Sequence, residues 1–131
     1  MNFTDVKIPA TWEESFEALD EFLKEYPSEL EYIDSSKSSD DMIVYHNGLG
    51  RMMRNHWSLW GDSELKKNLS EIGFTHADDM SGFILESYWN YRHSIPNDDE
   101  WVNSNVEKYR KYWASTTEQD AINMMMIVDD F

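Results

Sequence analysis

The chain has 131 residues, a formal net charge of −15 and a hydrophobic fraction of 40%. This length is typical of a single domain, spanning 1–131, with a core of its own, and the apolar content excludes disorder over most of the chain. Because cysteine is absent, thiol catalysis, thiolate zinc sites and disulfide bonds are excluded.

The negative charge is concentrated in the two outer parts of the chain. Residues 1–45 contain 12 acidic and 3 basic residues, residues 46–95 contain 6 and 5, and residues 96–131 contain 8 and 3. Such a field repels phosphate backbones and anionic membranes and attracts basic partners. We therefore expect a basic protein partner and no direct nucleic-acid binding, although acidic helix faces that serve only solubility are an alternative. With no apolar run of about 18 residues and no basic-then-apolar leader, we expect a cytoplasmic protein without membrane insertion.

The first helix is predicted over residues 11–26, because large apolar side chains recur there every three or four positions. Thr11 and Glu14 have the spacing of a capping box, and Pro27 ends the helix. The stripe consists of Trp12, Phe16, Leu19, Leu23 and Tyr26. Before it, a short extended strap on the core is predicted from Phe3, Val6 and Ile8.

Two glycines lie close together after this region. Residues 28–41 are interpreted as a turn of helix and a surface loop, and Asp40 and Asp41 favour the start of the next helix. Gly48 and Gly50 would each cost a helix about 1 kcal/mol relative to alanine. Either the chain turns there with positive φ, or another helix packs so closely that only a hydrogen atom fits at those positions. A phosphate-binding loop is excluded by the lack of a following Gly-Lys-Ser/Thr.

Two short helices are predicted next. The helix over residues 51–60 is expected to face the core with three large side chains, Met53, Trp57 and Trp60. The second begins at a cap formed by Asp62 or Ser63 and ends at Gly73.

A central helix follows, with Asp78 as its N-cap and Asp79 in its first turn. Its apolar stripe consists of Met80, Ile84, Tyr88 and Tyr91. Arg54 falls at the buried edge of the preceding helix, where an unpaired charge would cost several kcal/mol. A bridge from Arg54 to Asp79 is therefore predicted to join the two central helices.

The C-terminal part predicts one long helix, capped by Asn97, with a stripe formed by Val102, Val106, Tyr109 and Trp113. Residues 121–128 then predict a methionine-rich terminal helix that returns to the core or contacts a partner or a second copy. The fold class is therefore all-α, a compact domain of about six short to medium helices, monomeric or homodimeric.

The central motif resembles a known family. Residues 46–65 read HNGLGRMMRNHWSLWGDSEL, residues 76–85 read HADDMSGFIL, and residues 8–23 read IPATWEESFEALDEFL. Together they resemble a family of small bacterial domains of unknown function with the pattern HxGLGxxxRNxWxLWxxSxL followed by HxDDMS. The resemblance covers about residues 8–95 and implies no activity. The chain departs from the pattern at Ala77, where the family tends to carry proline, and continues as a helical extension over 96–131.

The matching positions of the motif are His46, Gly48, Leu49, Gly50, Arg54, Asn55, Trp57, Leu59, Trp60, Ser63, Leu65, His76, Asp78, Asp79, Met80 and Ser81. One group among them could support simple hydrolysis, with a histidine as general base, an aspartate that orients it and an arginine that holds an anion. This group consists of His46, His76, Arg54, Asp78 and Asp79. Structural pairing of Arg54 and helix capping by Asp78 are the alternatives.

Ligand or partner contacts are predicted at Arg51, Arg54, Asn55, Trp60, Met124 and Met125. The sequence contains no nucleophile elbow, phosphate loop or metal-ligand spacing such as HExxH, so we expect neither a metal nor a cofactor.

The leading functional hypothesis is a non-enzymatic acidic binding protein of the inhibitor or immunity type, which occupies a basic protein partner. Two alternatives stay open. One is a small hydrolase-like enzyme or anionic-ligand-binding domain that uses the His/Arg/Asp group. The other is a structural adaptor that assembles through the methionine-rich C-terminal helix.

Overall fold

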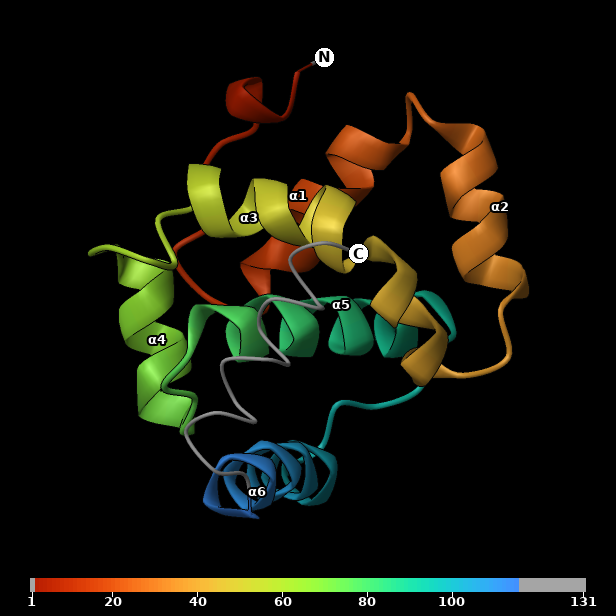
Figure 1. Cartoon of the computed structure of the whole chain (residues 1–131). Coiled ribbons are helices and arrows are strands. Elements are labelled where there is room, and N and C mark those ends of the chain that lie inside the picture. Colours follow the sequence, from red (N-terminus) through yellow and green to blue (C-terminus); the bar gives the residue numbers. More distant parts are fainter. Residues whose placement is uncertain (1, 116–131) are drawn as a thin grey trace.

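The computed structural model describes residues 2–115 and is all-α, which confirms the predicted fold class (Figure 1). The described residues form six α-helices and three short helical turns. In chain order these are η1 Phe3–Asp5, α1 Glu14–Leu23, α2 Pro27–Ser35, η2 Ser39–Tyr45, η3 His46–Gly50, α3 Arg51–His56, α4 Glu64–Ile72, α5 Ala77–Arg92 and α6 Asp99–Ser115. The predicted methionine-rich helix, with Met124 and Met125, lies outside the described residues.

Helix α5 is the centre of the molecule. In Figure 1, α1 and α3 lie on one side of it and α6 lies on the other, while α4 and α2 lie toward its two ends. Because neighbours cover it on several sides, burial is not confined to one stripe: Met80, Phe83, Ile84 and Tyr88 have no exposed surface. Tyr91, predicted as part of the stripe, is 43% exposed.

The two tryptophans of the central motif have opposite environments. Trp57 is completely buried and stacks on Phe3, with ring centroids 5.2 Å apart. The prediction that Trp60 faces the core is wrong, because its side chain is 56% exposed. Helix α3 ends at His56, and Ser58 has a φ of +55°. This break in the helical spacing turns Trp60 away from the face that Trp57 occupies.

The helix ends follow the predicted signals in part. The Ser63 hydroxyl accepts a hydrogen bond from the Lys66 amide at 3.1 Å, and α4 ends at Gly73 with a φ of +131°. Helix α1 begins at Glu14 instead of Thr11, although the Thr11 hydroxyl accepts from the Glu14 amide as expected. Asp98 replaces the predicted Asn97 as the cap before α6, because its carboxylate accepts from the Trp101 amide.

The N-terminal lead is only partly the expected strap. It begins with the helical turn η1, and Phe3 and Val6 are buried, but Ile8 is 47% exposed.

Gly48 and Gly50 lie in the helical turn η3, so the chain does not use positive φ there. A Cβ atom on Gly50 would lie 3.1 Å from both Arg54 Nη1 and the Tyr45 carbonyl oxygen. These two atoms belong to the turns directly before and after Gly50, whereas the nearest atom of a separate helix, Leu85 Cδ1 of α5, would lie at 3.6 Å, an ordinary contact. The close approach at Gly50 therefore involves its own neighbouring turns and not another helix. Gly48 has no neighbouring atom within 4 Å of such a Cβ.

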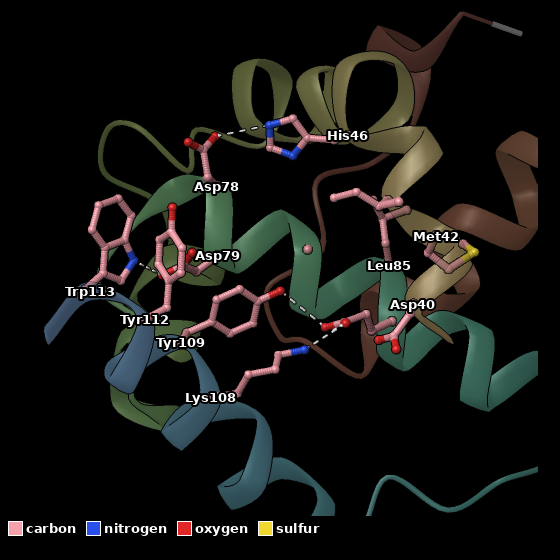
Figure 2. A pocket seen from close by; sticks show the side chains of 13 residues that line it. Asp40, Met42, His46, Asp78, Asp79, Leu85, Lys108, Tyr109, Tyr112 and Trp113 are labelled. Carbon is pink, nitrogen blue, oxygen red and sulfur yellow. Dashed lines mark hydrogen bonds and ion pairs between the residues drawn. The ribbon is translucent and has the colours of Figure 1, made fainter. Parts of the chain in front are cut away.

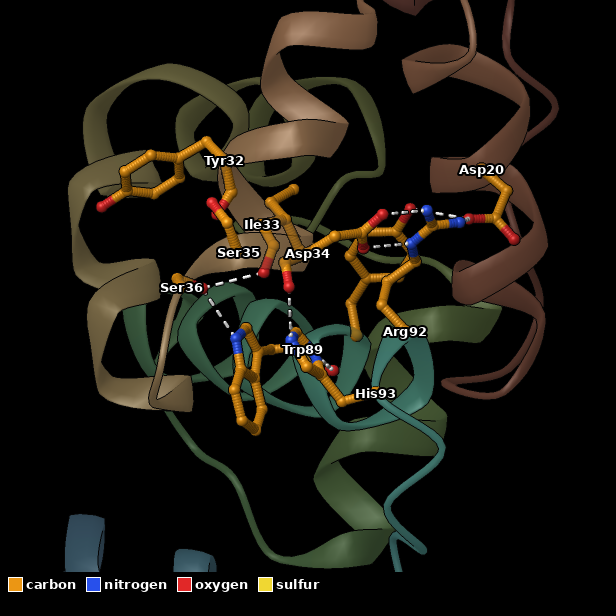
Figure 3. A network of polar contacts seen from close by, with 10 residues as sticks. Asp20, Tyr32, Ile33, Asp34, Ser35, Ser36, Trp89, Arg92 and His93 are labelled. Atoms are coloured by element: carbon orange, nitrogen blue, oxygen red, sulfur yellow. Dashed lines mark hydrogen bonds and ion pairs between the residues drawn. The ribbon is translucent and has the colours of Figure 1, made fainter.

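A polar network joins α5 to α1 and α2 (Figure 3). The Arg92 guanidinium donates to both carboxylate oxygens of Asp34, at 3.0 and 2.7 Å, and to Asp20 at 3.3 Å. The Tyr88 hydroxyl donates to the same Asp20 oxygen at 2.7 Å. Because Arg92 stabilises the charged form, the pKa of Asp34 is lowered. The network holds the first two helices against the central one.

Candidate functional site

A cavity of about 520 Å³ lies between α5, α6 and the segment 39–46, and we call it the α5–α6 cavity (Figure 2). Helix α5 contributes Asp78, Asp79, Gly82, Leu85 and Glu86 to its lining. Helix α6 contributes Lys108, Tyr109, Tyr112 and Trp113. The segment 39–46 contributes Asp40, Met42, Ile43 and His46. The walls therefore combine aromatic and aliphatic side chains with four carboxylates.

Two glycines allow α6 to lie where it forms one wall of this cavity. A Cβ atom on Gly82 would lie 2.8 Å from the Tyr109 hydroxyl oxygen, which is closer than real Cβ contacts allow. A Cβ atom on Gly73 would likewise lie 2.8 Å from Val106 Cγ1. The missing side chains thus permit α6 to approach both α5 and the end of α4.

Arg54 is buried behind the cavity and joins α3 to α5. Its Nε atom lies 3.3 Å from Asp78 Oδ1, and the Arg54 side chain is 2% exposed. Its Nη1 atom donates to the Ser81 hydroxyl at 2.8 Å, and its Nη2 atom donates to the His46 carbonyl at 3.1 Å. The prediction of a paired Arg54 is confirmed, but the partner is Asp78 and not Asp79.

Asp78 is also not the N-cap of α5. His76 holds that position, and Asp78 lies in the first turn. Since Asp78 and Asp79 are adjacent in a helix, their side chains point about 100° apart. Asp78 turns toward Arg54 and His46, with His46 Nε2 3.7 Å from its Oδ1 atom. Asp79 turns toward α6.

Asp79 is a buried carboxylate, 7% exposed, in the wall of the cavity. The Trp113 indole donates to its Oδ2 atom at 2.8 Å, and the His76 ring stacks on Trp113 at 4.1 Å between centroids. Oδ1 has no hydrogen-bond partner among residues 2–115. Burial raises the pKa of Asp79 to about 6, although the Trp113 hydrogen bond and the charge of His76 act in the opposite direction.

Glu86 of α5 and Lys108 of α6 form a second charged pair in the cavity lining. Lys108 Nζ donates to Glu86 Oε1 at 3.0 Å, and the Tyr109 hydroxyl donates to Glu86 Oε2 at 3.3 Å. Burial, together with the charge of Glu86, raises the pKa of Tyr109. Both oxygens of Glu86 are therefore engaged, and the Glu86–Lys108 pair carries no net charge.

Among residues 2–115, two carboxylates of the cavity lining have no cationic partner. Asp78 is paired with Arg54, and Glu86 is paired with Lys108. No Lys, Arg or His nitrogen within the described part of the chain forms an ion pair with Asp79 or Asp40. The cavity thus presents unbalanced negative charge next to aromatic rings.

The structure brings together only part of the predicted site. His46, Asp78 and Asp79 line the cavity, while Arg54 lies behind it and His76 stacks on Trp113. Arg51, Asn55 and Trp60 are exposed on α3 and the following turn and do not line the cavity.

The predicted site residues do not include Glu86, Lys108, Tyr109, Tyr112 and Trp113. Tyr109 and Trp113 belong to the predicted apolar stripe of α6, and this stripe is the one sequence feature that points to them. An aromatic residue on a helix stripe is typical of any core, however, so the pattern could not distinguish a cavity wall from ordinary packing.

These features define an all-α domain with an acidic, aromatic-walled cavity beside its central helix. Residues 8–92 match the family described as Domain of unknown function (DUF6794), and the chain belongs to this family. This confirms the expected membership of a family of unknown function. The match ends with α5, so the side chains that α6 contributes to the cavity lie outside it.

No curated protein and no solved structure matches the chain. Within residues 2–115, no helix combines the length and the apolar composition that crossing a bilayer requires.

Proposed function

We propose that the protein is a non-enzymatic binding protein of the inhibitor or immunity type, which engages a basic protein partner at the α5–α6 cavity. The observation that carries this proposal is the unbalanced charge of the cavity, where Asp40 and Asp79 have no ion-pair partner in the described part of the chain. Asp40 is exposed, whereas Asp79 is buried. A buried carboxylate without a cationic partner costs folding free energy unless a ligand compensates for it.

The rest of the molecule supports the same partner chemistry. The net charge of −15 attracts a basic protein over long distances and speeds its encounter. The rim of the cavity is also apolar: Ile43 is 58% exposed and the adjacent Val44 is 50% exposed. Apolar groups around a charged anchor exclude water from it, which is the usual arrangement of a binding hot spot.

The test is affinity capture from native lysate with the immobilised full chain at low and high salt. We expect a basic protein whose capture weakens as salt increases, because ionic contacts are screened. The double variant Asp40→Asn/Asp79→Asn should lose this partner. The matched control Glu13→Gln/Glu17→Gln makes the same change of charge on exposed residues of the α1 region, across α5 from α6, and should retain it.

Two outcomes would contradict the proposal. One is that no captured protein shows salt-sensitive binding. The other is that the two double variants lose the partner equally, since the cavity would then contribute nothing beyond total charge.

A second candidate function rests on one observation, the proximity of His46 and Asp78 in the cavity lining. A carboxylate that orients a histidine is the usual arrangement of a general base. Arg54, the predicted anion-holding group, is 2% exposed and engaged by Asp78, Ser81 and the His46 carbonyl. Hydrolysis of chromogenic carboxylic and phosphoric esters that disappears in His46→Gln would favour this candidate over the first.

A further inference from the structure

We propose that the α5–α6 cavity receives an arginine side chain of the basic partner, with the guanidinium bound by Asp79 and the aromatic side chains of α6. This inference rests on the proposed function and adds the chemical group that the cavity recognises.

The lining indicates an organic cation. Met42, Leu85 and Tyr109 contribute aliphatic and aromatic surface, whereas a hard metal ion requires six or more oxygen ligands. Among the described residues, no three His, Asp or Glu side chains are placed to hold a metal ion. A volume of about 520 Å³ exceeds that of one side chain, so the arginine and its flanking backbone can enter together.

The aromatic wall favours a guanidinium over an ammonium group. Tyr109, Tyr112 and Trp113 lie on one side of the cavity in Figure 2. A guanidinium is planar, stacks on aromatic faces and is less strongly hydrated than the lysine ammonium. Its several N–H donors can also form more than one hydrogen bond at once. Asp79 Oδ1, which accepts no hydrogen bond from residues 2–115, can accept one of them.

Charge complementarity favours a cationic group of another molecule as the occupant. Asp40 and Asp79 in the lining have no ion-pair partner among residues 2–115, so a cation balances charge that the described part of the chain leaves uncompensated.

The protonation of Asp79 supports the same assignment. Burial raises its pKa to about 6, so an approaching cation stabilises a charge that the protein alone disfavours. The charged or titratable groups that act on Asp79 or line the same cavity come from all three walls: His46, His76, Asp78, Glu86, Asp40, Lys108, Tyr109 and Tyr112. Binding should therefore depend on pH through Asp79. The variant Asp79→Asn distinguishes the pH dependence due to Asp79 from that due to the other titratable groups.

The experiment is isothermal titration of the full chain with N-acetyl-arginine-methylamide at pH 7.5 and low salt. We expect saturable binding with a Kd on the order of 1 mM. The citrulline analogue has almost the same shape without the charge and should bind at least about tenfold more weakly. The lysine analogue should bind more weakly than arginine because it cannot stack.

A comparison of a variant in the cavity with a variant on α1 tests whether arginine binds in the cavity. Asp79→Asn should weaken arginine binding about tenfold, and Glu17→Gln on α1 should leave it unchanged. At pH 5 the wild-type Kd should rise about fivefold, because about nine in ten Asp79 carboxyls are then protonated, and Asp79→Asn should lack this change. Circular dichroism of each variant shows that it is folded.

Citrulline binding as tight as that of arginine, tighter binding of lysine, or an unchanged Kd in folded Asp79→Asn would each overturn this inference. The two proposals fail separately. Capture of a salt-sensitive basic partner without arginine binding removes only this inference, whereas the lack of any such partner removes the proposed function.

Discussion

The carboxyl of Asp79 has a pKa of about 6 in the folded chain, compared with 3.8 for an unperturbed aspartate. The folded state therefore binds this proton more tightly than the unfolded state does, and its stability falls as pH rises through this interval. Two pKa units correspond to about 3 kcal/mol. At neutral pH a single buried charge thus opposes folding, which is expected of a residue retained for binding.

The substitution Asp79→Asn should remove this dependence. We expect the variant to have a higher free energy of unfolding than the wild type at pH 7.5, with the difference disappearing toward pH 4, because the asparagine carries no charge at either pH. Urea denaturation at the two pH values measures the difference. If the difference in free energy of unfolding between the variant and the wild type is the same at pH 7.5 and at pH 4, the buried charge of Asp79 does not destabilise the fold.

The two tryptophans of the motif provide a second comparison. Trp57→Ala should cost about 3–5 kcal/mol, because it empties a fully buried site. Trp60→Ala should change stability by less than about 0.5 kcal/mol, because the side chain is 56% exposed. Thermal or urea unfolding of both variants tests this order, and equal losses would contradict the placement of Trp60.

Single residues also mark the limit of prediction from sequence. The burial of Arg54 and its need for an acid followed from its position beside apolar residues. The choice between Asp78 and Asp79 depends on the rotation of α5 relative to α3, which no local pattern fixes. The helical spacing does not extend to Trp60, because the helix breaks at Ser58. Ser58 has a positive φ although it is not a glycine, so the sequence does not indicate the break.

At the level of elements, the positions of the helices in the sequence are easier to predict than the tertiary contacts between them. The stripe of α6 and the end of α4 at Gly73 follow from local spacing and capping. The first predicted stripe is only partly confirmed, because Trp12 and Tyr26 lie outside α1 and Pro27 begins α2 instead of ending α1. The cavity depends on segment 39–46 and α6 meeting around α5, although they are far apart in sequence. Such contacts depend on tertiary packing and could not be derived from periodicity.

The glycines test how closely these elements approach one another. Gly73→Ala should cost about 1–3 kcal/mol, because the position has a φ of +131° and the new Cβ would meet Val106. Gly48→Ala is the matched control, with open space around the new Cβ, and should stabilise the helical turn by up to about 1 kcal/mol. Unfolding measurements compare the two, and a tolerated alanine at position 73 would mean that α6 does not pack there.

At the scale of the whole molecule, charge and shape act at different ranges. The net charge of −15 attracts any basic protein and selects none of them. Selection is expected from the α5–α6 cavity, where burial and aromatic surface coincide with Asp79 Oδ1, which accepts no hydrogen bond from the described part of the chain. For such a partner, the negative charge of the whole surface would increase the association rate, and the contacts in the cavity would determine the specificity.

The most direct test of this account is a nuclear magnetic resonance titration of the ¹⁵N-labelled full chain with N-acetyl-arginine-methylamide. The six tryptophans give separate indole N–H signals, and the Trp113 indole N–H donates to Asp79. We predict that arginine shifts the Trp113 signal most and leaves that of buried Trp57 unchanged, whereas the citrulline analogue shifts neither. If arginine leaves the Trp113 signal in place, or moves that of exposed Trp60 instead, the cavity does not bind an arginine side chain as proposed.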